Sequence, residues 1–169
     1  MRNRILGLIF PLALTLFSLG VSASESISPR GRTVILNSID GHKVVAEFVT
    51  HEVNIRQPNT KQRLPSVPGC TYARFPCIFL DSLRIAVDGS QVAVPLSVSA
   101  TLPDLMTAEL RKNEQNFVLI LKGGDASEGY KVIVEFDKSG IKSRRLYGPF
   151  DPDFVLEETV YHQENAADN

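Results

Sequence analysis

The sequence predicts an all-β protein, an antiparallel β-sandwich or small barrel of about eight to ten hairpin-linked strands with at most one short helical turn. From Arg32 onward, apolar residues alternate with polar ones, which is the pattern of strands with one buried face. The pairs Asp40-Gly41 and Asp88-Gly89 separate such runs, and both residue types tolerate the positive φ values of tight hairpin turns. No long stretch shows the spacing of an amphipathic helix.

Residues 1–23 are predicted to be a cleavable signal peptide. Arginines at positions 2 and 4 precede an apolar run from Ile5 to Leu19, and small residues end it at Ala23. The alternative is a membrane anchor, but the run is shorter than the roughly 20 residues that a spanning helix needs, and it contains Pro11. We therefore expect a periplasmic or secreted protein with no stable membrane anchor after cleavage. No cysteine follows the cleavage site before Cys70, which argues against lipidation.

The remaining chain is long enough for a single β domain, expected at 32–161. Residues 24–31 are small and polar and predict a flexible leader, and 162–169 predict a disordered tail. The full chain has a net charge of −1, and cleavage removes two arginines, which makes the mature protein more acidic. Because no basic stripe is present, nucleic acid and anionic membranes are not expected partners.

Cys70 and Cys77 are predicted to form a disulfide, because an exported chain meets an oxidising compartment. Their spacing is not that of a redox pair, and no histidine follows as in haem attachment. No further cysteines complete a zinc site. The disulfide would restrain the proline-rich loop 57–76. The sequence predicts no cofactor.

Several features of the strand pattern locate hairpins, bulges and edges. Apolar residues change parity in the strand that follows Asp40-Gly41, which predicts a bulge or break near Val49–Glu52. The hairpin around Asp88-Gly89 is predicted to return through Val92, Val94 and Leu96. Thr101–Lys112 could be a helix capped by Thr101 or a helical turn followed by a short strand, and the turn plus strand is favoured. The later segments are predicted as a central strand (Phe117–Leu121), a half-buried strand (Tyr130–Asp137), a polar edge strand (Ile141–Tyr147) and a last strand (Phe154–Tyr161).

The best candidate for a binding site is the loop 123–130, which is longer than a hairpin connection needs. Asp125, Ser127 and Glu128 offer acceptors and a hydroxyl, and Tyr130 would supply an aromatic anchor. The alternative is plain turn chemistry, because glycine, aspartate and serine are common turn residues.

Other candidate sites are weaker. Calcium would require Asp125, Asp151 and Asp153 to meet, although the regular ligand pattern is missing. The histidines are isolated in the sequence, so no metal site is predicted; they are His42, His51 and His162.

No serine or cysteine has the sequence context of an activated nucleophile, so we predict no catalytic residue. Alternation places Glu157 and Glu158 on opposite faces of a strand, where they cannot flank one bond. Three basic residues near each other, Lys142, Arg144 and Arg145, are split between two faces in the same way, which weakens the idea of a patch for an acidic partner.

The sequence favours a soluble, non-enzymatic domain of a bacterial envelope. It would bind an envelope protein through loops such as 123–130 and 57–80, as an adaptor, an inhibitor or an immunity-like protein. One alternative is a small-ligand or carbohydrate carrier built on a β-barrel, which a deep apolar cavity would reveal. Another is a hydrolase of unrecognised type, which would require a cleft where carboxylates converge with histidine.

Overall fold

The structure is a computed structural model, and it describes residues 24–53, 70, 76–100 and 102–162. The predicted signal peptide, most of the loop 57–76 and the tail from residue 163 lie outside the described residues.

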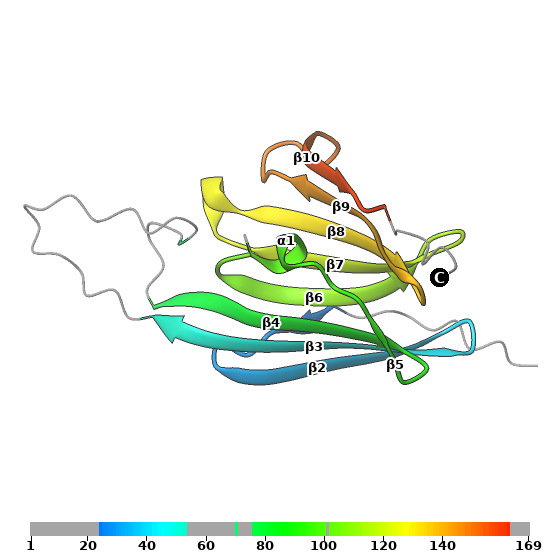
Figure 1. The fold of residues 1–169 in the computed structure, drawn as a ribbon. Coiled ribbons are helices and arrows are strands. Elements are labelled where there is room, and N and C mark those ends of the chain that lie inside the picture. Colours follow the sequence, from blue (N-terminus) through cyan, green and yellow to red (C-terminus); the bar gives the residue numbers. More distant parts are fainter. Residues whose placement is uncertain (1–23, 54–69, 71–75, 101, 163–169) are drawn as a thin grey trace, which may run out of the picture.

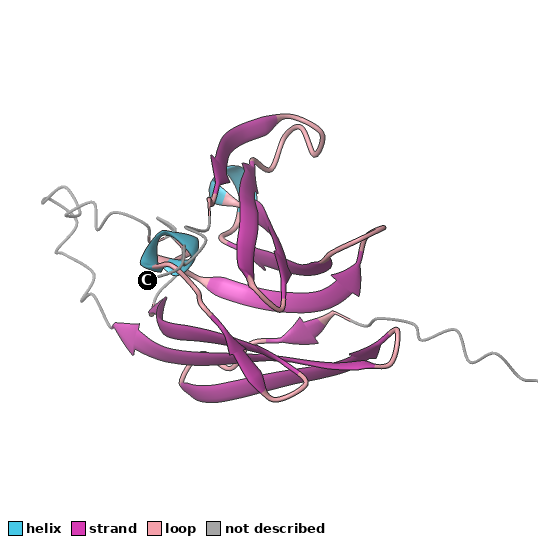
Figure 2. Ribbon diagram, turned by 45° about the vertical axis from the view of Figure 1, so that its right-hand side comes forward, coloured by secondary structure: helices cyan, strands magenta, loops and turns pink. Residues whose placement is uncertain are grey.

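Two antiparallel sheets pack face to face as a sandwich (Figures 1 and 2), which confirms the predicted all-β class and shows no closed barrel. Sheet A has six strands in the order β1-β6-β7-β8-β9-β10, and sheet B has four in the order β2-β3-β4-β5. The strands of sheet A are β1 (Glu25–Ser26), β6 (Leu105–Lys112), β7 (Phe117–Gly123), β8 (Tyr130–Asp137), β9 (Gly140–Tyr147) and β10 (Val155–Val160). Those of sheet B are β2 (Gly31–Ile39), β3 (His42–Val53), β4 (Cys77–Val87) and β5 (Ser90–Val92). Two short helical segments join them, α1 (Leu96–Ser99) and the 3₁₀ turn η1 (Ala126–Glu128).

Both predicted hairpin turns are present in sheet B. Asp40 and Gly41 have φ values of 49° and 78°, and they connect β2 to β3. Asp88 and Gly89 have φ values of 52° and 85°, and they connect β4 to β5. Two successive residues with positive φ match the right-handed twist of the flanking strands, which is why these residue pairs fix the register.

The predicted bulge is present, but its extra residue lies in the neighbouring strand. The pairing of β3 with β4 shifts between Val49 and Thr50, whose partners are Ser82 and Leu80. Asp81 is therefore the additional residue, and β3 itself keeps its alternation, because Thr50 is buried like Phe48 before it. The predicted position near Val49–Glu52 is confirmed, whereas the parity change on which it was based does not come from an extra residue in β3.

The core lies between the inner faces of the sheets. Val44, Ala46 and Phe48 on β3 are fully buried, as are Val132 and Val134 on β8. The central strand predicted at Phe117–Leu121 is confirmed, since β7 runs between β6 and β8 and buries residues of both parities. This strand needs apolar side chains on both faces, because Val118 on the outer face is also buried.

Three sequence predictions differ from the structure. Within the expected flexible leader, β1 pairs with β6 and Ile27 is buried in the core. The return strand predicted through Leu96 ends at Val92, since Pro95 has no backbone donor and α1 follows. The segment predicted as an edge, β9, is internal because β10 pairs outside it.

Asp104 joins the two sheets at one end of the sandwich. Its carboxylate Oδ1 accepts a hydrogen bond from the Ile78 backbone N–H at 2.8 Å, and its own N–H donates to the Ile78 carbonyl at 2.7 Å. Its carbonyl accepts from the Gly124 N–H at 3.1 Å, just beyond β7. Asp104 is fully buried with a φ of 49°, a backbone conformation that aspartate and asparagine adopt more readily than most residues.

We predict that Asp104→Ala lowers the free energy of unfolding by about 2–3 kcal/mol, because a buried donor loses its acceptor and alanine is strained at this φ. Asp104→Asn should cost less, since its amide oxygen can still accept from Ile78 and asparagine tolerates positive φ. Urea unfolding followed by circular dichroism measures both. Equal stability of the alanine variant and the wild type would contradict this role of Asp104.

Candidate functional site

The loop predicted as a binding site is ordered by its own backbone. Asp125 caps η1, with its carboxylate accepting from the Ala126 N–H at 2.8 Å, and its carbonyl accepts from the Glu128 N–H at 2.9 Å. The side chains of Asp125, Ser127 and Glu128 are exposed. The loop therefore has the hydrogen bonds of an ordinary turn, which the sequence offered as the alternative to a binding site. It also presents three polar side chains to solvent.

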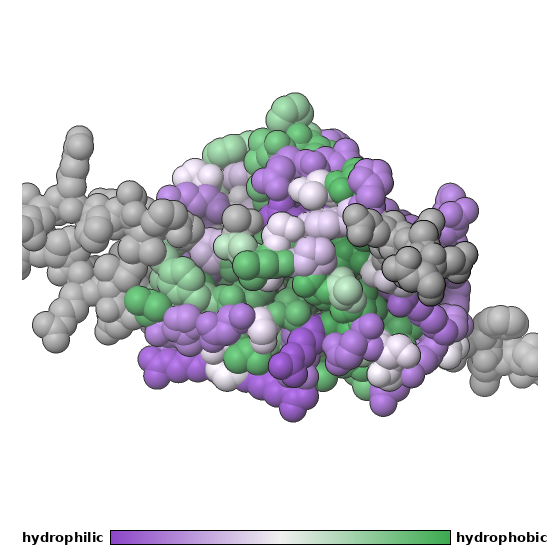
Figure 3. Space-filling model, in the orientation of Figure 1, coloured by the Kyte–Doolittle hydropathy of each residue, from purple (hydrophilic) through white to green (hydrophobic). Residues whose placement is uncertain are grey.

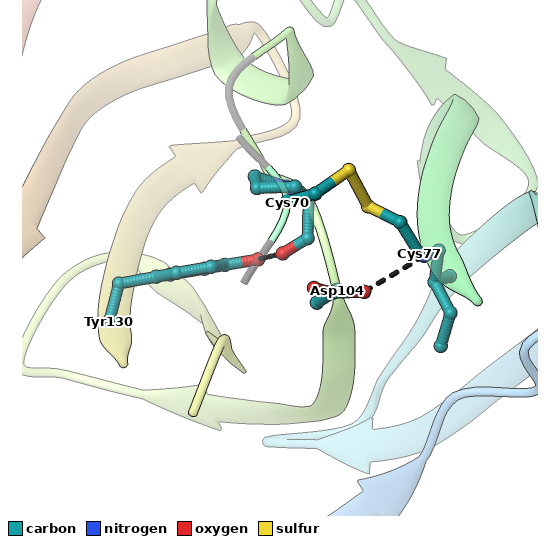
Figure 4. The surroundings of a disulfide bond; sticks show 6 residues. Cys70, Cys77, Asp104 and Tyr130 are labelled. Carbon is teal, nitrogen blue, oxygen red and sulfur yellow. Dashed lines mark hydrogen bonds between the residues drawn. A yellow bond between two sulfur atoms is a disulfide. The ribbon is translucent and has the colours of Figure 1, made fainter. Parts of the chain in front are cut away.

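Tyr130 differs from the exposed anchor that the sequence predicts. Its side chain points inward over Gly123, its cross-strand neighbour, and its hydroxyl donates to the Pro103 carbonyl at 2.8 Å (Figure 4). A Cβ on Gly123 would lie 2.5 Å from the Tyr130 ring carbon Cζ, so only glycine leaves room for the ring. Burial, and then the nearby charge of Asp104, raise the pKa of Tyr130 far above its usual range.

The predicted disulfide between Cys70 and Cys77 is present. Cys77 is completely buried at the start of β4, beside the Ile78 backbone that bonds Asp104. Figure 4 shows Asp104 between Tyr130 and Cys77. One end of the sandwich therefore concentrates a disulfide, a buried carboxylate and a partly buried tyrosine, each of which connects separate segments of the fold.

A second loop, 148–154, lies beside the predicted one. Lys131 at the start of β8 donates from Nζ to the Pro152 carbonyl at 3.0 Å, and a Cβ on Gly129 would lie 3.5 Å from Pro149. Asp151 shapes this second loop, because its Oδ1 accepts from the N–H groups of Asp153 and Phe154 at 3.0 and 3.2 Å. In this loop, Phe150 is 82% exposed to solvent and Phe154 is 60% exposed.

These phenylalanines continue into an exposed last strand. We define the β10 surface as the exposed apolar residues of this hairpin: Phe150, Phe154, Val155, Leu156 and Val160. In Figures 1 and 2, β10 lies at the end of the molecule farthest from sheet B, and Figure 3 shows hydrophobic side chains gathered there. On β10, Leu156 and Val160 share one face and Val155 lies on the other, so this surface combines the loop phenylalanines with apolar side chains on both faces of the strand. Exposed apolar side chains that gather in one region mark an interaction site more often than isolated ones do.

Consecutive ion pairs hold β10 against β9, one on each face of the sheet. Arg144 Nη1 donates to Glu157 Oε1 at 2.8 Å on the inner face, where Arg144 is only 1% exposed. Arg145 lies on the outer face between Glu135 at 3.0 Å and Glu158 at 2.7 Å. The prediction that Glu157 and Glu158 lie on opposite faces is confirmed, and so is the same prediction for Arg144 and Arg145. The two arginines therefore form no basic patch.

The histidines and aspartates considered for metal binding are separated into local pairs. His42 bonds Asp88 at 2.8 Å, and His51 bonds Asp81 at 2.6 Å on the outer side of the bulge. His162 is exposed beyond β10. Within the described residues, no three His, Cys, Asp or Glu side chains form a group that could hold a metal ion.

The two neighbouring loops differ in how far the sequence pointed to them as candidates. Sequence reasoning selected the polar loop 123–130 and missed the aromatic residues of 148–154, which it treated as a connection. The available signal was the pair Phe150 and Phe154 within a turn of glycine, proline and aspartate, where nothing in the strand pattern requires an apolar side chain.

Comparisons with known protein families, curated proteins and solved structures found no match to this chain. No helix in the described part of the chain is long and apolar enough to cross a membrane.

We predict that Tyr130→Phe lowers the unfolding free energy by about 1 kcal/mol at pH 7, because the Pro103 carbonyl loses its donor. The difference from wild type should shrink above about pH 10, where the unfolded tyrosine ionises and the buried one, with its raised pKa, does not. Urea unfolding of both proteins at neutral and alkaline pH measures it. A difference that stays constant with pH would contradict the buried position of the hydroxyl.

Proposed function

We propose that this protein is an exported, non-enzymatic domain that binds a protein partner through the β10 surface and the neighbouring loop 123–130. The observation that carries this proposal is the exposure of Phe150 and Phe154, which a loop needs neither for its turn nor for the core. Large aromatic side chains contribute disproportionately to binding energy at protein interfaces.

The surroundings of the β10 surface favour a specific protein contact. Asp125, Ser127 and Glu128 supply exposed polar groups on a loop that the Lys131–Pro152 hydrogen bond and the closeness of Gly129 to Pro149 bring next to loop 148–154. Protein interfaces commonly combine an apolar centre with a polar rim. Hydrogen bonds within each loop fix both loops before any partner arrives, which reduces the entropy lost on binding.

A carrier of small ligands is the alternative, and the described residues give it less support. Between the sheets, side chains such as Phe48, Leu119 and Phe136 are fully buried against one another in one continuous core. A depression formed by described residues is open and polar, and it lies at the turn 113–116. Small-ligand sites are usually enclosed and mainly apolar.

Export supports the same reading. The Cys70–Cys77 disulfide fits an oxidising compartment, and the apolar segment of residues 1–23 has the order of a signal peptide. We propose a periplasmic or secreted location, where the partner would be a protein of the cell envelope.

The test is a double variant, Phe150→Ser with Phe154→Ser, and the matched control is Leu36→Ser. Leu36 is 54% exposed on the outer face of sheet B, so the control removes a similar apolar group from the other side of the molecule. Mature protein captures partners from envelope extract, and the enriched protein is then purified and titrated against each variant by calorimetry.

We expect the double variant to bind at least about tenfold more weakly than wild type, whereas the control should bind within about twofold of it. Both should unfold within about 0.5 kcal/mol of wild type, because exposed side chains contribute little to stability. Equal affinity of all three proteins, or a partner that is a soluble small molecule, would overturn the proposal.

A further inference from the structure

We propose that the partner segment is an extended strand that pairs with the free edge of β10, and that it carries basic residues flanked by apolar ones. This inference rests on the proposed function and adds the geometry and chemistry of the contact. The strand would continue sheet A by one member, through backbone hydrogen bonds.

The direction of the backbone groups of β10 is fixed by its pairing with β9. The Tyr161 N–H donates to the Lys142 carbonyl at 2.9 Å, so Tyr161 and, by alternation, Thr159 direct their backbone toward β9. Glu158 and Val160 then direct their N–H and C=O groups away from the sheet. An incoming strand finds these donors and acceptors in line.

The other sheet edges in the described part of the chain are short or covered. The outer side of β6 is bonded by β1 and by Asn37, whose side-chain amide donates to the Leu110 carbonyl at 3.1 Å. On sheet B, β2 lies in contact with β6, and β5 has only three residues before the chain turns away at Pro95. The edge of β10 combines length with exposure, since five of its six residues are exposed.

The acidic side chains of β10 favour a partner strand that carries basic residues. Glu157 and Glu158 stand in the middle of β10, with side chains 54% and 46% exposed although each is paired with an arginine. Asp151 and Asp153 add acidic groups on the preceding loop. A basic residue opposite Glu158 would gain a favourable cross-strand pair on the outer face, and valine-like residues two positions to either side of it would cover Leu156 and Val160 on the same face.

The same charges disfavour a second copy of this chain as the occupant. In an antiparallel pair of two β10 strands centred on these residues, glutamate would lie opposite glutamate, and like charges directly opposite are destabilising. The occupant is therefore a different protein.

The experiment uses the mature protein and a short acetylated peptide, Thr-Val-Thr-Lys-Thr-Val-Thr, whose lysine and two valines share one face of an extended strand. Its comparison peptide replaces the lysine with glutamate, and a third carries N-methyl groups on alternate amides, which blocks strand pairing. Val160→Pro removes one outward N–H and is tolerated by a strand whose donor faces solvent, whereas Val160→Thr is the matched control that keeps the donor. Binding is measured by fluorescence anisotropy, and amide hydrogen exchange reports on Glu158 and Val160.

We expect the lysine peptide to bind at least about tenfold more tightly than the glutamate and N-methylated peptides. Val160→Pro should weaken binding by about tenfold or more, and Val160→Thr by less than about threefold. The outward amide of Glu158 should exchange fast in the free protein and slow down when the peptide is added.

Several results would overturn the inference. They are absence of peptide binding up to about 1 mM, equal binding of all three peptides, and an unchanged affinity of Val160→Pro. A dimer that Val160→Pro dissociates would assign the edge to a second copy, and slow exchange of Glu158 that deletion of residues 163–169 abolishes would assign it to the chain's own tail. Preference for anionic lipid vesicles over the peptide would assign the surface to a membrane.

These results are distinguishable from a failure of the proposed function. If the Phe150→Ser and Phe154→Ser variant loses a captured envelope protein while Val160→Pro retains it fully, the protein binds a partner through the loop and not by strand addition.

Discussion

The meeting of the two sheets at Asp104 is the constraint on which the rest of the structure depends. One residue bonds β4 in sheet B with its N–H and carboxylate, and bonds the end of β7 in sheet A with its carbonyl. The same place holds the disulfide on one side and Tyr130 over Gly123 on the other. Because the loop 123–130 leaves the fold at this point, the position of the candidate site follows from a buried junction far from solvent.

Local chemistry explains which parts of the fold were predictable from the sequence. The hairpins at Asp40-Gly41 and Asp88-Gly89 depend on positive φ values that few residue types adopt, so these residue pairs alone predict the hairpins. Pairing between distant strands is less accessible. The position of β9 inside the sheet follows from glutamates on β10 that neutralise its arginines, and only the register of the two strands reveals this arrangement.

In the candidate site, too, the local turn could be predicted from the sequence, whereas the contacts between distant segments could not. Asp125 and the residues beside it indicate an exposed turn, because residues such as aspartate bond nearby backbone groups, as the Asp125 carboxylate does with the Ala126 N–H. The proximity of loop 148–154 depends on a tertiary contact between Lys131 and the Pro152 carbonyl, which no local pattern encodes. The inward direction of Tyr130 likewise depends on the absence of a side chain at Gly123, on the adjacent strand.

The way β10 is attached has a consequence for folding cooperativity. Its side chains are almost all outside the core, so the strand is held by backbone bonds and by two ion pairs rather than by apolar burial. Such a segment can open locally at a lower free energy than the whole domain, and salt would lower that energy further. Opening is restrained because it would leave the charge of Arg144 in the core without the carboxylate of Glu157. The last strand is thus expected to open before the rest of the domain, and salt should weaken the exposed Arg145–Glu158 pair more than the Arg144–Glu157 pair.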